Sequence, residues 1–161
     1  MVVSSTRPNE LIVQYQLSGM PVGDTIHFGS EFNFATMPGG ASDRYFYDGR
    51  GSQLGTLDSE QQLESTHRLG LVDEWQGLDV NLEFSENAAL WAFPIETISQ
   101  SESGFELVHQ SVAVVPHWQF VVPESGTWAV EMRLILDTSL AKARELTAVA
   151  ETHPAEPVEA T

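Results

Sequence analysis

The chain contains no cysteine and only one lysine, Lys142, among its 161 residues. Without cysteine it has no disulfides, thiolate nucleophiles or cysteine-ligated zinc, a composition typical of cytoplasmic proteins. No apolar run approaches the roughly 20 residues that a membrane span requires, and the first residues lack the apolar segment of a secretory signal. We therefore expect a cytoplasmic protein that has no membrane partner.

Positive charge is also scarce, because 23 acidic residues stand against 7 basic ones and the formal net charge is −16 at pH 7. Such a surface repels nucleic-acid phosphates and anionic lipids, which argues against nucleic-acid and membrane-surface roles. An uncharged ligand such as a glucan feels no such repulsion. The alternative interpretation is that the acidity serves solubility alone.

The sequence has no amphipathic helix of useful length before its tail, and alternating apolar residues instead predict strands. The predicted strands cover residues 11–17, 26–34, 44–47, 66–75, 78–84, 89–98, 105–115 and 127–136. Pro94 indicates an edge position or a bulge. We predict an all-β fold, an antiparallel β-sandwich at residues 10–138. A flexible N-terminus at residues 1–9 precedes it, and an acidic tail at residues 139–161, disordered or short-helical, follows it.

Catalytic motifs are missing from the sequence. It has no G-x-S-x-G elbow, phosphate-binding glycine loop, H-E-x-x-H motif or EF-hand loop. The five histidines are scattered, and carboxylates are so numerous that their presence alone indicates nothing. We therefore predict no catalytic residue, no metal site and no cofactor.

Four tryptophans provide flat apolar surfaces on which sugar rings stack. Parity along its strand predicts that Trp128 belongs to the core, and we expect Trp91 to belong there too. Trp118 follows Pro116 and His117 in what we interpret as a bent loop, so it is our candidate for surface stacking. Simple packing of Trp118 remains the alternative.

Four segments resemble the C-terminal region of glycoside hydrolase family 57 α-amylases and 4-α-glucanotransferases. They are residues 43–48 (DRYFYD), 67–80 (HRLGLVDEWQGLDV), 93–106 (FPIETISQSESGFE) and 115–118 (VPHW). The resemblance implies a β-sandwich of the galactose-mutarotase type that packs against a catalytic barrel. It also implies that the catalytic carboxylates belong to the barrel, and that this chain matches only the later part of the β-sandwich region.

Our leading hypothesis is a non-catalytic, carbohydrate-associated accessory domain that packs against a glucan-processing barrel in trans or contacts an α-glucan weakly. The candidate contact residues are polar or aromatic groups at predicted strand ends and loops: Glu31, Asn33, Asp73, Glu74, His117 and Trp118. A second hypothesis is a mutarotase-like epimerase, in which His109 or His117 works with Glu31. A third is a purely structural or assembly role.

The first predicted strand, residues 11–17, lacks the neighbours that would precede it in the complete family region. We expect it to be an unpaired sheet edge, which is prone to association. A homo-oligomer with Val13 and Tyr15 near the contact would cover that edge.

Overall fold

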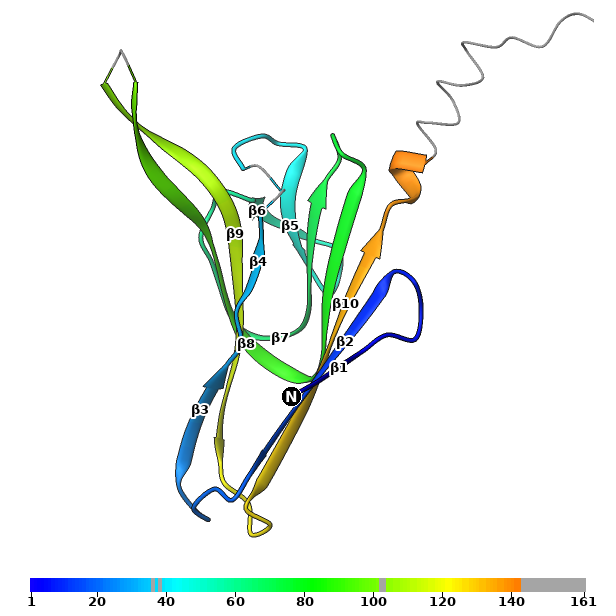
Figure 1. The fold of residues 1–161 in the computed structure, drawn as a ribbon, viewed down its shortest axis with the longest axis vertical. Helices are drawn as coiled ribbons and strands as arrows, with labels where there is room; N and C mark the ends of the chain where they lie inside the picture. The colour runs from blue at the N-terminus through cyan, green and yellow to red at the C-terminus, as the bar shows by residue number, and fades with distance from the viewer. Residues whose placement is uncertain (36, 38, 102–103, 143–161) are drawn as a thin grey trace, which may run out of the picture.

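The computed structural model describes residues 1–35, 37, 39–101 and 104–142 (Figure 1). In these residues the antiparallel strands are β1 (Val2–Ser4), β2 (Glu10–Ser18), β3 (Thr25–Gly29), β4 (Phe32–Phe34), β5 (Arg44–Asp48), β6 (Gln53–Thr56), β7 (Gln61–Asp73), β8 (Leu78–Ser101), β9 (Gly104–Val121) and β10 (Thr127–Asp137). Residues 139–142 form a helical turn. The predicted all-β sandwich is confirmed, and most of the predicted tail lies outside the described residues.

A single sheet folds over on itself to give two layers. In the first layer, residues 78–84 of β8 lie between β10 and the second half of β7, and β1, β2, β5 and β6 extend the sheet. In the second layer, residues 88–92 of β8 lie between the first half of β7 and β9, which also pairs with β3 and β4. The ladder between β7 and β8 is irregular between Leu63 and Arg68, where the two layers diverge. Figure 1 shows β3 and β9 on one side and β10, β2 and β1 on the other.

The core fills the space between the layers. The inward residues of β8 are Val80, Leu82, Phe84, Ala88, Leu90 and Ala92, all of them buried. They meet Phe46, Leu69, Leu71, Val112, Val114, Trp118, Val130 and Met132 from the other strands. Burial of this apolar surface is the main favourable term in folding. Residues 78–84 and 89–98, which we predicted as separate strands, are thus parts of one bent strand.

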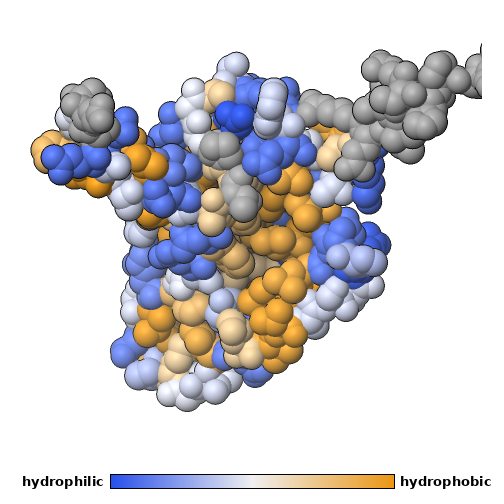
Figure 2. Space-filling view, turned by 45° about the horizontal axis from the view of Figure 1, so that its top comes forward, coloured by the Kyte–Doolittle hydropathy of each residue, from blue (hydrophilic) through white to orange (hydrophobic). Residues whose placement is uncertain are grey.

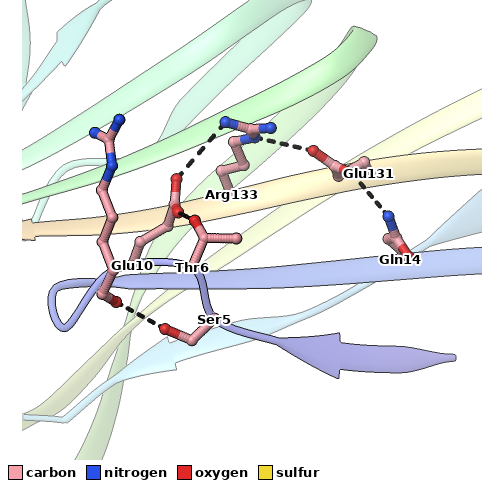
Figure 3. Close-up of polar contacts among 7 residues, drawn as sticks. Ser5, Thr6, Glu10, Gln14, Glu131 and Arg133 are labelled. Carbon is pink, nitrogen blue, oxygen red and sulfur yellow. Dashed lines mark hydrogen bonds and ion pairs between the residues drawn. The ribbon is translucent and has the colours of Figure 1, made fainter.

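The N-terminal residues differ from the flexible segment that we predicted, because β1 pairs with β2 and a polar network follows it (Figure 3). Thr6 donates a hydrogen bond to the carboxylate of Glu10, and Arg133 Nη1 lies 3.6 Å from Glu10 Oε1. Arg133 Nε also donates to Glu131 Oε1 at 2.9 Å, and Gln14 donates to Glu131 Oε2 at 2.9 Å. These contacts tie the N-terminal hairpin to β10.

The expected free edge at residues 11–17 is also wrong. Strand β2 pairs with β10 along its whole length and with β1 from Ile12 to Gln14. Val13 is buried and Tyr15 is half-buried in the core. These two side chains therefore do not lie on a free surface.

Strands β8 and β9 continue past the body of the sandwich as a projecting hairpin, residues 95–101 and 104–109, which we name the arm (Figure 1). Ile98 pairs with Leu107, and Phe105 follows on the same face. These side chains are 73%, 66% and 78% exposed respectively. Figure 2 shows apolar side chains gathered in the middle of one face of the molecule and again on the arm.

Tyr47 of β5 lies flat over Gly70 of β7, its partner in the ladder. A Cβ atom on Gly70 would lie only 2.0 Å from Tyr47 Cε1. We predict that Gly70→Ala lowers the free energy of unfolding by about 1–3 kcal/mol, because the ring is forced off the sheet. Gly29→Ala is the matched control, since its Cβ would meet His117 Cβ at an ordinary 3.4 Å. Urea denaturation measures both; equal effects of the two substitutions would contradict the prediction.

Candidate functional site

The structure divides the six predicted contact residues among three places. Asn33 and His117 lie on the outward face of the second layer, where Asn33 pairs with Ala113 and His117 with Gly29. Glu31 is beside them, because Asn33 Nδ2 donates to Glu31 Oε1 at 2.7 Å. Asp73 and Glu74 lie at the end of β7 in the first layer. Trp118 lies in the core.

Trp118 is therefore not a surface-stacking residue. Its side chain is 6% exposed, stacks near Phe28 at 6.2 Å between ring centroids, and donates its indole N–H to the Glu86 carbonyl at 3.3 Å. The reason is that Pro116 does not bend the chain into a loop: β9 runs straight through it, so Trp118 keeps the inward parity of Val114.

Trp91, which we predicted to be in the core, is instead 41% exposed. Its position in β8 lies between the buried residues Leu90 and Ala92, so alternation turns it outward. Its ring centroid is 4.1 Å from that of His117 with the planes inclined at 39°, and 6.3 Å from that of His27. We name His27, Trp91 and His117 the aromatic platform.

A groove of about 530 Å³ borders this platform. Its lining consists of Glu60, Gln61, Gln62, Trp91, Ala92, Phe93 and Pro94. Gln62 is the ladder partner of Trp91 on β7, so an amide lies directly beside the exposed indole. The volume falls within the roughly 300–1,000 Å³ of small-ligand sites.

The two histidines of the platform share a hydrogen bond of 2.9 Å between His27 Nε2 and His117 Nδ1. Burial lowers the pKa of His117, and the nearby charge of a protonated His27 lowers it further. His117 Nε2 is buried and makes no hydrogen bond within the described residues. Both effects favour the neutral form of His117.

The histidine–carboxylate pairs of the epimerase hypothesis are not formed among the described residues. His117 contacts His27, and Glu31 accepts its hydrogen bond from Asn33. His109 Nε2 contacts the Met37 carbonyl at 3.0 Å. Proton transfer between these histidines and Glu31 has no geometric support here.

A second polar cluster, formed by Tyr47, Arg68, Asp79 and Asn81, covers the outward face of the first layer. Tyr47 Oη lies 2.9 Å from Asp79 Oδ1 and 2.7 Å from Asn81 Oδ1. Arg68 donates to Asn81 Oδ1 at 2.7 Å and to Tyr47 Oη at 3.1 Å. Burial raises the pKa of both Tyr47 and Asp79, although Arg68 opposes the shift in each. The groups satisfy one another, so this cluster binds β5, β7 and β8 together.

Sequence reasoning did not select these residues, although three of them lie in the segments that carry the family resemblance. Tyr47 belongs to residues 43–48, and Arg68 and Asp79 belong to residues 67–80. Their alternation on neighbouring strands was the available signal, but it becomes useful only once the register is known.

Asp73 and Glu74 hold the connection from β7 to β8. Asp73 is fully buried, accepts the Gln76 N–H at 2.9 Å, and lies 3.4 Å from Arg44 Nε. Glu74 accepts a hydrogen bond from Tyr45 at 3.1 Å. The buried carboxylate is matched by a cation and a backbone donor, which is what a buried charge requires. Asp73 therefore acts in folding.

The described residues contain no cluster of three or more side chains able to hold a metal ion. Within the same residues, no helix is long and apolar enough to cross a membrane.

Comparisons with known proteins identify the class to which this fold belongs. Residues 2–132 match the family described as "Alpha-amylase/4-alpha-glucanotransferase, C-terminal". The chain is 31% identical over 114 residues to Alpha-amylase 1 of Dictyoglomus thermophilum, covering 68% of this chain and 15% of that protein. It also resembles the 4-alpha-glucanotransferase of Thermococcus litoralis, with a TM-score of 0.57 and 21% identity over 83% of this chain and 17% of that one.

The chain therefore belongs to the alpha-amylase/4-alpha-glucanotransferase C-terminal family. It spans less than a fifth of each of these two relatives. The family resemblance that the sequence suggested is confirmed.

The pKa of His117 makes stability depend on pH. The unfolded chain takes up a proton near pH 6.5, whereas the folded chain resists it because the pKa of His117 is lowered. Stability is thus fully present above this pH and falls as the pH drops through and below it. We predict that the free energy of unfolding decreases between pH 7.5 and 5.5, and that His117→Gln reduces the decrease. The exposed His67→Gln is the control; an identical pH dependence in the His117 variant would show that the platform does not cause it.

Proposed function

We propose that this protein is a non-catalytic accessory domain of an amylolytic system, which packs against a catalytic barrel and contacts an α-glucan weakly. Membership of the C-terminal family supports the proposal. The assignment to the galactose-mutarotase type, the cytoplasmic location and the absence of catalytic groups belong to the same proposal.

The main structural support for docking to a catalytic domain is the exposed apolar face of the arm. Ile98, Phe105 and Leu107 lie on the arm face that continues the inward side of the sandwich, because alternation along β8 places Ile98 with Leu90. Exposed apolar patches with polar surroundings mark surfaces that another protein covers. The catalytic domain of an amylase-type enzyme is the partner that the family supplies.

A chimaera tests this docking. We predict that residues 1–142, placed on the catalytic portion of the Dictyoglomus relative in place of its own C-terminal region, raise the melting temperature and starch hydrolysis above those of the truncated enzyme. Phe105→Ser with Leu107→Ser removes most of the gain, because two apolar contacts are lost. Trp75→Ser, in an exposed turn, is the control.

Two results would contradict the proposal. One is a chimaera no more stable than the truncated enzyme. The other is starch hydrolysis by this chain alone, which the accessory role excludes.

We propose that, when the chain is isolated from a catalytic domain, a second copy covers the arm and a homo-oligomer forms. Val13 is buried and Tyr15 is half-buried in the core, so we place the contact on the arm and no longer on β2. We predict a mass above the 17.7 kDa of one chain by light scattering at tens of micromolar. The Phe105→Ser, Leu107→Ser variant is expected to shift toward one chain, whereas Trp75→Ser is not. An unmodified chain of single-chain mass would reject self-association.

A further inference from the structure

The four tryptophans fall into two pairs by environment. Trp118 and Trp128 pack with one another at 5.7 Å between ring centroids and belong to the core or its border. Trp75 is 72% exposed in the turn between β7 and β8. Trp91 alone among them presents an exposed ring from the middle of a long strand, with a groove beside it.

We infer that Trp91 is the stacking surface for the glucosyl rings of an α-glucan, with His117 as its support and Gln62 and Glu60 as partners for sugar hydroxyls. The choice of glucan as ligand rests on the proposed function. The position of the site rests on the geometry of the platform and groove.

The platform is rigid before any ligand arrives. Trp91 has a ladder partner on each side, Gln62 on β7 and Val115 on β9. His117 covers one part of the indole at 4.1 Å, and His27 approaches its edge at 81°. A ring that is already fixed loses little conformational entropy when a ligand stacks on it, which favours binding.

The groove supplies the remaining requirements of a sugar site. Phe93 lies two residues along β8 on the same face, about 7 Å from Trp91 along the strand, and it also lines the groove. Glu60 and Gln62 add a carboxylate and an amide to the same lining. Small-ligand sites usually combine aromatic rings with a few hydrogen-bonding groups. Here the rings would contact the C–H surfaces of the sugar, and the polar groups would bond to its hydroxyls.

The surrounding charge favours an uncharged ligand over an anionic one. Glu60 borders the groove, and the whole chain has a net charge of −16 at pH 7. A phosphorylated or carboxylated sugar would be repelled, whereas a neutral glucan would not. On the first layer, Tyr47, Arg68, Asp79 and Asn81 hydrogen-bond to one another, which favours the second layer as the ligand face.

Titration of the full chain with maltoheptaose tests the inference, using the indole N–H signals of the four tryptophans in ¹H–¹⁵N NMR. We expect the Trp91 signal to shift and saturate at millimolar sugar, while the Trp75 signal stays in place. Trp91→Ala is expected to weaken binding at least about fivefold, as loss of an aromatic platform does. Trp91→Phe keeps a ring and is expected to retain part of the affinity, and Trp75→Ala is the matched control.

Several results would overturn the inference. They are a shift at Trp75 alone, no shift at any indole, and unchanged affinity in a folded Trp91→Ala variant. Equal affinity for maltoheptaose and glucose 6-phosphate would also overturn it, because the charge argument would fail. Failure of the chimaera to gain stability, with the Trp91 shift intact, would reject docking to a catalytic domain and leave the sugar site standing.

Discussion

The pairing of β7 with β8 along both layers is the interaction on which the rest of the structure depends. The two strands run together from Gln61 opposite Ala92 to Asp73 opposite Leu78, and each passes from one layer to the other. Because one strand pair serves both layers, its irregularity between Leu63 and Arg68 sets where the sheet folds and where the core closes. The inward residues of β8 on either side of this bend therefore face the same core.

The alternation of inward and outward side chains along the strands explains which sequence predictions were correct and which failed. The apolar alternation at residues 78–84 identified the inward face of that strand correctly, since Val80, Leu82 and Phe84 are buried. Trp118 was placed outside the core because the prediction allowed Pro116 to break a strand. Trp91 was placed in the core although it alternates with the inward residues Leu90 and Ala92. A strand tolerates a proline wherever the missing N–H has no required acceptor. Parity counted through Pro116 would have placed Trp118 inward.

Contacts between residues distant in the sequence could not be predicted from the sequence, for a different reason. The platform joins His27, Trp91 and His117 from three strands, and only the register brings them together. The contacts of Arg133 with Glu10 and of Gln14 with Glu131 likewise depend on β10 pairing with β2. The surfaces of the domain therefore differ. On the first layer the polar groups hydrogen-bond to one another. The second layer presents the Trp91 ring and a groove, and the arm presents apolar side chains.

Amide hydrogen exchange tests the central claim, that this domain docks through its arm and leaves its second-layer face free. The measurement compares the isolated chain with the chimaera on the catalytic portion of the Dictyoglomus relative. The account predicts slower exchange in the chimaera at the arm, residues 95–101 and 104–109, and unchanged exchange at His27 and Trp91. Unchanged exchange at the arm, together with new protection at the platform, would contradict it.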